Sequence, residues 1–227
     1  MQHLQYFPEP YPDECLYSIF CRYFVRSAET SHQRIRKELY GSYVSNTPSI
    51  FNPRVLRKFD IWFSGDAGLN RKTITLKHTM YQYMSIFYSD DLINAANKYI
   101  ETGEIEERFE RSQIIKTKNV RKEFLSYCPE CVKEDIRTFG ETYWHRLHQI
   151  QGVECCPKHY VQIESSIIPI NKTTYRFRPA SSFAFSSGEI VPSEFRAGFR
   201  EQYVKIAKDI EWLLNHGLTL GGASAMD

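Results

Sequence analysis

Four residues between positions 128 and 159 have side chains and spacing that suit a metal ion. Cys128 and Cys131 form a Cys-x-x-Cys pair, and Cys156 and His159 form a Cys-x-x-His pair after 24 intervening residues. Two residues between ligands allow a tight turn to direct both side chains at one ion, and a tetrahedral zinc ion needs two such pairs. The spacing therefore predicts one zinc ion held by these four side chains.

The residues beside the ligands favour a structural role for this zinc. Pro129 and Pro157 directly follow the first ligand of each pair, where the fixed backbone angle of proline orders the turn. Cys155 is an alternative to Cys156, but it would lengthen the second turn by one residue. Four protein ligands close a zinc site and leave no position for water or substrate, so we expect a structural ion.

His145 and His148 form a further His-x-x-His pattern, within the segment TYWHRLHQI. If this segment is extended, residues three apart point to opposite faces and do not share a metal. Packing, hydrogen bonding or a DNA contact is then the favoured role. A zinc-supported nuclease of the His-Asn-His type would use one of them as a base beside an open metal site. No asparagine and carboxylate stand at a suitable spacing, so we do not expect an enzyme.

Composition and charge restrict the class of protein. The chain has 227 residues, enough for one large or two compact domains, and its 42% hydrophobic content can build a core. It carries 29 basic and 27 acidic residues, so contact with DNA requires a local basic patch. Six cysteines without a secretion signal favour metal ligands over disulfides. No segment approaches the roughly 20 apolar residues of a membrane span, so we expect a soluble, cytoplasmic protein.

Helical periodicity dominates residues 1–110, and the predicted fold is mainly α with a small zinc-binding module. Apolar residues recur at helical spacing over about 14–28, and a second short helix is expected over 32–41. The tight polar turn between them suggests a helix-turn-helix, with an ordinary helical hairpin as the alternative. The second helix carries the first set of candidate DNA contacts: Arg34, Arg36 and Lys37.

Residues 111–170 form the predicted zinc-knuckle module. Between the knuckles we expect a short helix over 132–140, ended by Gly140, and a strand over 143–150. Such a module has little core of its own, so metal binding would supply on the order of 10 kcal/mol of its folding free energy. The basic stretch before the first knuckle carries the second set of candidate DNA contacts: Lys116, Lys118, Arg121 and Lys122.

Residues 171–217 are expected to form an extended segment and a C-terminal amphipathic helix. The segment over 173–188 is polar and indicates a strand or an ordered loop. The helix is predicted over 193–217, and its apolar face is expected to pack on the core. That face comprises Phe195, Phe199, Ile206, Ile210, Leu213 and Leu214. Residues 218–227 have no structure-forming pattern and are expected to be a disordered tail.

Three stretches together resemble the TniQ/TnsD family of transposon target-selection proteins. They are YFPEPYPDECLYSIFCRY at 6–23, YCPECVKEDIRTFGETYWHRLHQIQGV at 127–153 and CCPKH at 155–159. In that family a proline-rich entry precedes the first helix, and a G-E-x-[YF]-W-[HQ]-R stretch separates two knuckles. The resemblance covers about residues 5–165. Tyr160 departs from it, because the family often has glycine after the histidine ligand.

The resemblance implies a DNA-binding adaptor rather than the transposase. Members recognise the insertion site, either through a specific DNA sequence or together with an RNA-guided CRISPR effector. They then recruit an AAA+ ATPase regulator that brings in the transposase. The implied partners are DNA, this ATPase, and a CRISPR effector complex or a second copy of the chain. The low net charge leaves open an alternative, a module that binds only protein partners and has no DNA binding of its own.

Overall fold

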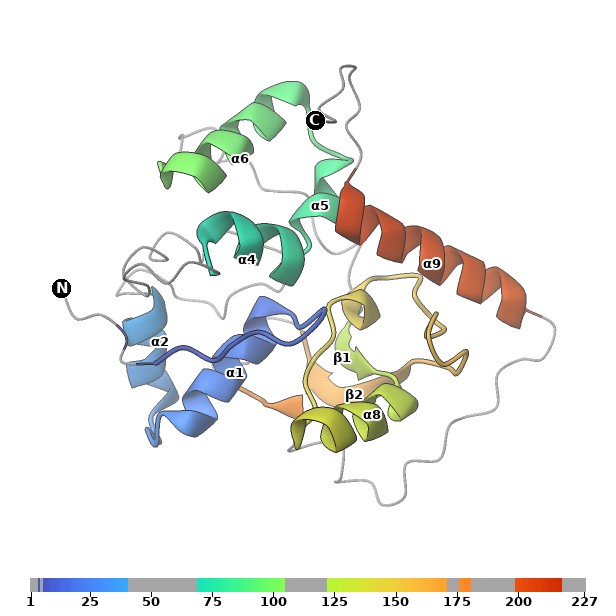
Figure 1. The fold of residues 1–227 in the computed structure, drawn as a ribbon, viewed down its shortest axis with the longest axis horizontal. Helices are drawn as coiled ribbons and strands as arrows, with labels where there is room; N and C mark the ends of the chain where they lie inside the picture. Colours follow the sequence, from blue (N-terminus) through green and yellow to red (C-terminus); the bar gives the residue numbers. More distant parts are fainter. Residues whose placement is uncertain are drawn as a thin grey trace.

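The computed structural model describes residues 4, 6–40, 69–104, 122–170, 176–180 and 199–217. Within these ranges the protein is mainly helical, with one small sheet, which confirms the predicted fold class (Figure 1). In Figure 1 the metal-ligand region, residues 122–170, lies beside the first helix, and the helices of residues 71–102 lie above them. Residues 41–68 of the predicted helical region and the predicted tail at 218–227 lie outside the described residues.

Helix α1 (Leu16–Arg26) lies in the centre of the protein. Its first eight residues are all buried: six are apolar or aromatic, and the two polar ones, Ser18 and Arg22, lie on one face and bind Trp144 and Glu14. Cys15 occupies the N-cap position, and its side chain makes no hydrogen bond to the helix. Asp13, which precedes it, has a φ of 54° and its carboxylate binds residues 146 and 147 instead. The N-terminal segment is thus fixed to the metal-ligand region before the helix begins.

Helix α2 (His32–Tyr40) follows α1 after a short connection, as predicted for the helix-turn-helix region. Ile35 and Leu39 are buried on one face of α2, one turn apart. Gln33, Arg34 and Lys37 are exposed on the opposite side. The predicted pair of helices is present, with polar residues facing outward.

Three further helices form the upper part of the protein in Figure 1: α4 (Arg71–His78), α5 (Tyr81–Ser85) and α6 (Asp90–Thr102). Asn70 caps α4, since its side chain accepts a hydrogen bond from the amide of Thr73 at 2.8 Å. Gly103 ends α6 in the left-handed conformation, φ 78°, which glycine adopts without steric cost.

The metal-ligand region contains a two-stranded antiparallel sheet that the sequence analysis did not predict. Strand β1 (Phe124–Tyr127) pairs with β2 (Glu164–Pro169), with Ser126 opposite Ser165 and an irregularity towards Phe124. Helix α8 (Pro129–Phe139) follows β1 and ends at Gly140, as predicted. It begins three residues earlier than expected, because the first knuckle is itself the first turn of the helix.

The strand predicted over 143–150 is wrong. Here His145 forms an isolated bridge with Glu14, and the next residues form the short 3-10 helix η3 (Leu147–Gln149). Its backbone groups bind α1 and the loop before it, and it meets the neighbouring strand β1 through the side chain of Gln149, which bonds to the Ser126 backbone, so no strand ladder forms. Cys15, for example, donates its amide to the Trp144 carbonyl at 2.9 Å.

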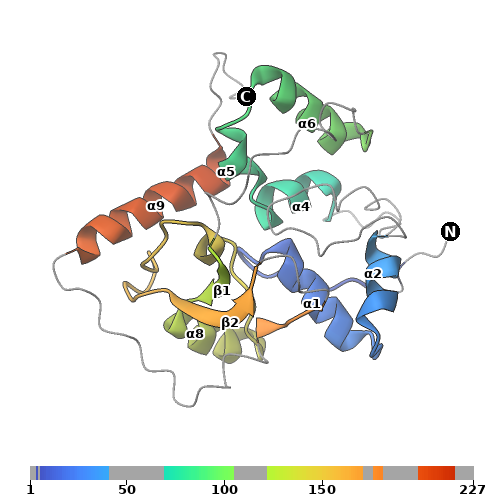
Figure 2. The same cartoon turned by 180° about the vertical axis from the view of Figure 1, so that it is seen from behind.

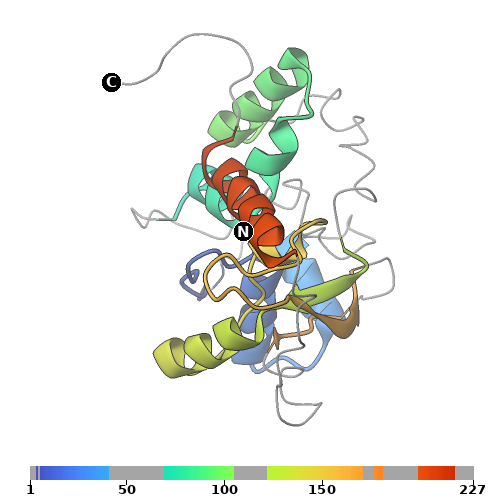
Figure 3. The ribbon, with the colours of Figure 1, turned by 90° about the vertical axis from the view of Figure 1, so that its right-hand side faces the viewer.

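Helix α9 (Arg200–His216) ends at Gly217 as predicted and runs from α5 along the metal-ligand region, as Figures 2 and 3 show from behind and from the side. Its predicted apolar face is only partly correct. Leu214 is buried, but Phe199 and Ile206 are 58% and 44% exposed. Val204 and Ala207 are buried in their place, so the helix is rotated towards its small residues.

One continuous cluster of buried side chains extends from the helices to the metal ligands. It includes Ile19 and Phe20 of α1, Tyr99 of α6, Trp144, and also Cys131. The boundary predicted near 110 lies outside the described residues, and the division into separate domains stays a prediction. In the part of the chain that the structure describes, no helix combines the length and apolar character needed to cross a bilayer.

Candidate metal centre

The four predicted ligands converge on one point. The Sγ atoms of Cys128, Cys131 and Cys156 and a ring nitrogen of His159 all lie within 4.8 Å of one another. His159 Nδ1 is 3.6, 3.3 and 3.7 Å from these three sulfurs in that order. Zinc bonds of about 2.0–2.3 Å in a tetrahedron place ligand atoms roughly 3.5–3.8 Å apart. The cluster therefore has the size and donor set to hold a metal ion.

The first knuckle is positioned by the start of α8. Cys128 is the residue before the helix, and its Sγ accepts a hydrogen bond from the Cys131 amide at 3.4 Å. Pro129 occupies the first helical position, where its missing amide hydrogen has no helical partner to lose. A sulfur that caps a helix start also lies near the positive end of the helix dipole, which favours a thiolate.

The second knuckle is a tight turn between residues 156 and 161. The Tyr160 amide donates to the Cys156 carbonyl, and the Cys156 amide donates to the Val161 carbonyl, both at 2.8 Å. Cys155 is buried, bridges to Gln162 and is not one of the clustered residues. The structure thus brings Cys156, and not Cys155, to the other ligands.

Hydrogen bonds among the sulfurs shift their proton affinities in opposite directions. The bonds from Cys128 and Cys131 lower the pKa of the Cys156 thiol. Cys131 has its pKa raised by its bonds to Cys128 and Cys156, with burial adding to the effect. A divalent cation bound here would release the protons of the three thiols, because thiolates rather than thiols bind metals.

A carboxylate stands behind the histidine ligand. Glu134 Oε2 lies 3.3 Å from His159 Nε2, so it can orient the ring with Nδ1 towards the sulfurs. The same oxygen accepts from Lys158 Nζ at 2.5 Å, and this hydrogen bond lowers the pKa of Glu134. The sequence analysis missed Glu134, although its position one helical turn after Cys131 places it on the same helix face.

His145 and His148 do not point to opposite faces, contrary to the prediction. Because the chain turns into η3, their ring centroids lie 4.8 Å apart. His145 Nε2 donates to Asp135 at 2.9 Å, and Thr142 binds the same carboxylate oxygen. His148 Nε2 is 4.0 Å from the Cys131 sulfur. Both histidines therefore support the metal cluster and the loop beside it, in agreement with the favoured packing role.

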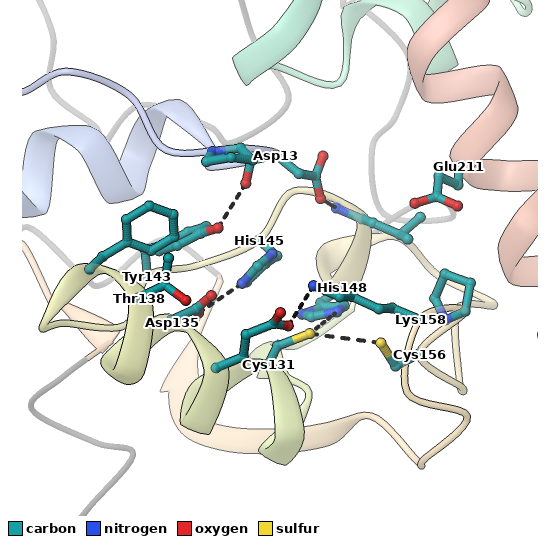
Figure 4. Close-up of a pocket in the computed structure, with 15 residues that line it drawn as sticks. Asp13, Cys131, Asp135, Thr138, Tyr143, His145, His148, Cys156, Lys158 and Glu211 are labelled. Carbon is teal, nitrogen blue, oxygen red and sulfur yellow. Dashed lines mark hydrogen bonds and ion pairs between the residues drawn. The ribbon is translucent and has the colours of Figure 1, made fainter.

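A cavity of about 270 Å³ opens beside the cluster, between α8, the N-terminal loop and α9 (Figure 4). Its carboxylates include Asp13, Glu134, Asp135 and Glu211. The first three accept hydrogen bonds from Arg146, Lys158 and His145 respectively. Burial raises the pKa of Glu211, and the charges of Asp13 and Cys156 add to this. Paired carboxylates of this kind hold the surrounding elements together.

The segment 140–146 fastens the metal-ligand region to α1. Arg22 of α1 binds Glu141 at 3.0 Å and the buried Glu14 at 2.7 Å, and Arg26 also binds Glu141. The amide of Trp144 donates to Ser18 Oγ at 3.1 Å. The sequence analysis used this stretch only as a signature, whereas the structure gives it a mechanical role.

The candidate DNA contacts fall into three groups. Arg34 is 80% exposed on α2 and pairs with Glu29 at 3.4 Å, and Lys37 is also exposed. Arg36 is half-buried on the same helix. Lys122 is only 11% exposed, because its Nζ donates to the Val153 carbonyl at 2.5 Å, and burial lowers its pKa. The prediction that Lys122 reaches phosphates is therefore not supported. Three predicted residues lie outside the described ranges: Lys116, Lys118 and Arg121.

Comparison with known proteins defines the class. The TniQ family profile matches residues 5–163, which contain both knuckles and α1, and the chain belongs to this family. It is similar to the Transposon Tn7 transposition protein TnsD of Escherichia coli. The two are 22% identical over 153 residues, which are 67% of this chain and 30% of TnsD. The matched part thus spans less than a third of the length of that relative.

Proposed function

We propose that Cys128, Cys131, Cys156 and His159 bind one structural zinc ion. The support is the tetrahedral size of the cluster, its three sulfur donors and the carboxylate behind His159. All four ligands come from the protein, so the ion would hold the two knuckles together and leave no open position for chemistry.

Metal analysis of the purified protein tests this. We expect about one zinc per chain, and a loss of zinc in Cys128→Ser and His159→Ala. Cys155→Ser is the matched control, because this cysteine is adjacent to a ligand but stands outside the cluster. Unchanged zinc content in the two ligand variants, or a loss in the control, would show that the ligand set is different.

We further propose that the chain selects target sites in DNA transposition. The observation that carries this proposal is membership in the TniQ family across residues 5–163, together with the similarity to a transposition protein. In this role the chain is an adaptor and not an enzyme. It binds DNA at the insertion site, directly or with a CRISPR effector, and recruits an AAA+ ATPase regulator.

The surface of α2 supports the DNA-binding part of the proposal. A helix that presents polar and cationic side chains outward, braced by a preceding helix, matches the arrangement by which helix-turn-helix proteins enter the major groove. Here Ile35 and Leu39 anchor α2, and Gln33, Arg34 and Lys37 face outward. The overall charge of +2 means that this local patch must supply the attraction to DNA.

A DNA-binding titration over a salt series, paired with co-purification of the ATPase regulator, tests the adaptor. We expect affinity to fall steeply as salt rises, because phosphate contacts release counterions. The alternative is a module that binds only protein partners, and the near-neutral charge favours it. Absence of DNA binding at low salt with retained ATPase binding would establish that alternative.

A further inference from the structure

The segment 176–180, far from α2 in sequence, is held at the start of this helix. The Tyr17 hydroxyl donates to the Arg176 carbonyl at 3.2 Å and accepts from the Arg178 amide at 3.1 Å. Trp144 Nε1 donates to the Arg178 carbonyl at 2.8 Å. The Phe177 amide donates to His32 Nδ1 at 3.1 Å. Backbone atoms of the segment make all these contacts, so its position does not depend on the arginine side chains.

Phe177 anchors the segment and leaves the arginines on either side of it. Its ring is 2% exposed and stacks on Phe24 at 5.5 Å, and Phe24 in turn stacks on His32 at 4.2 Å. Arg176 is exposed and Arg178 is half-buried. The burial therefore alternates along the segment, with the apolar residue inward.

Arg176 and Arg178 stand on either side of Phe177, whose amide binds His32 at the N-terminus of α2. His32, the first residue of α2, has its pKa lowered by burial and then by the charges of Arg176 and Arg178. The helix start itself carries a partial positive charge. Successive helix residues are about 100° apart, so Arg36 projects on the same side as His32, and Gln33 and Lys37 lie next to it. The arginines thus extend the cationic surface of α2 along one of its flanks.

The nearby carboxylates are used elsewhere. Glu29 pairs with Arg34 at 3.4 Å, and Glu38 accepts from the Tyr23 hydroxyl at 2.9 Å. Among the described residues, Arg176 makes no ion pair with a carboxylate. An exposed guanidinium such as that of Arg176, which no described carboxylate neutralises, suits an anionic partner.

We propose that Arg176 and Arg178 contact the phosphate backbone of duplex DNA beside the groove that α2 enters. The inference rests on the DNA binding in the proposed function, and it names a second contact segment for it. DNA fits this surface because phosphates line both edges of a groove that holds a helix, so cations are needed on the flanks of the helix. Guanidinium groups bind phosphate oxygens in a planar, two-point manner.

The test is the salt dependence of DNA affinity for Arg176→Gln and for Arg176→Gln with Arg178→Gln. Each lost phosphate contact should reduce the slope of log affinity against log salt by about 0.9. The loss should be the same for target and non-target DNA, since phosphates carry no sequence information. Arg137→Gln, an exposed arginine on α8, is the matched control and should keep the wild-type slope. Thermal unfolding of each variant checks that the fold is kept.

The outcomes separate this inference from the proposed function. If the wild-type protein does not bind DNA at low salt, DNA binding itself is wrong and the inference fails with it. If the wild type binds but Arg176→Gln has the slope of the control, only the inference is overturned. If Arg176→Gln retains the wild-type slope but loses the ATPase regulator, the surface belongs to a protein partner instead.

Discussion

His78 is a buried imidazole between α4 and the loop before α1. Its Nδ1 donates to the Glu14 carbonyl at 2.7 Å. The neutral ring can make this hydrogen bond with its single proton on Nδ1. Burial lowers the pKa of His78 to about 4, and the charge of Arg146 contributes to the shift. Between about pH 6.5 and pH 4 the unfolded chain therefore protonates His78 while the folded protein keeps the ring neutral.

This shift predicts a pH-dependent loss of stability. The folded-state pKa is below the ordinary value of 6.5, so the contribution of His78 is complete above about pH 6.5 and is lost as the pH falls towards 4. Between pH 7 and pH 4 we expect the wild type to lose about 3 kcal/mol more unfolding free energy than His78→Gln. Urea unfolding at several pH values measures this. Loss of metal at low pH affects both proteins equally and cancels in this comparison. Parallel curves would therefore show that the folded protein does not hold the ring neutral.

Tyr160 adopts a conformation that its side chain disfavours. Its φ is 59°, in the left-handed region, which costs a non-glycine residue roughly 1–2 kcal/mol. Its hydroxyl accepts from Lys208 Nζ at 3.1 Å, so a surface contact to α9 offsets part of this cost. The Tyr160 side chain thus adds a contact between the second knuckle and α9 that a glycine could not make.

The cost of the positive φ of Tyr160 can be measured once the hydrogen bond from Lys208 has been removed. In a Lys208→Ala background, we expect Tyr160→Gly to raise the free energy of unfolding by about 1 kcal/mol, because glycine adopts positive φ without penalty. Thermal or urea unfolding of the metal-loaded protein measures the change. Tyr160→Ala in the same background is the control, since alanine keeps the strain, and an equal gain there would contradict the explanation.

At the scale of elements, Arg146 joins three parts of the fold. Its Nε binds Asp13 at 3.0 Å, and its Nη1 donates to the Leu76 and Thr79 carbonyls at 2.6 and 3.1 Å. Its Nη2 donates to Asn215 of α9 at 3.0 Å. A single buried guanidinium thus links the N-terminal loop, the end of α4 and the end of α9 to the segment between the knuckles.

Replacing this arginine should separate those elements. We expect Arg146→Met to lower the free energy of unfolding by about 3–5 kcal/mol, since it leaves the Asp13 charge and buried carbonyls without their partner. Arg26→Met is the matched control. Its ion pair with Glu141 is partly exposed, so it should cost only about 0–1 kcal/mol. Equal losses in the two variants, measured by urea unfolding, would show that Arg146 does not have this linking role.

At the scale of the whole molecule, the Cys/His cluster and α1 share one core. Cys128, Cys131 and Cys156 belong to the same buried cluster as Ile19 and Phe20 of α1. Backbone bonds from Cys15 to Trp144 and from Arg146 to Asp13 join the two regions directly. Metal binding at the knuckles is therefore expected to stabilise the central helix as well.

Chelation tests this coupling. Removal of a structural zinc would lower the folding free energy of the knuckle region by on the order of 10 kcal/mol. We expect the amides of α1 to lose protection from hydrogen exchange together with those of α8. Helix α6 provides an internal reference, because it packs mainly against α4 and lies far from β1 and α8 in Figure 1. Changes confined to residues 122–170 would instead show that the knuckle region folds as an independent unit.

The sequence alone was sufficient for features that depend on a few consecutive residues. The four clustered side chains that could hold a metal lie in two short turns, so their spacing alone pointed to them. The end of α8 was predicted because the glycine at 140 adopts positive φ. These features are set by local backbone geometry, which a sequence pattern records directly.

Tertiary packing decided the remaining features. The segment containing His145 and His148 became a 3-10 helix rather than a strand, because α1 and the N-terminal loop take its hydrogen-bonding groups. Lys122 is not exposed, because its Nζ donates a hydrogen bond to the Val153 carbonyl. The segment that carries Arg176 lies beside α2 because Phe177 packs against Phe24. Each of these depends on contacts between residues far apart in the chain, and such contacts leave no periodic trace in the sequence.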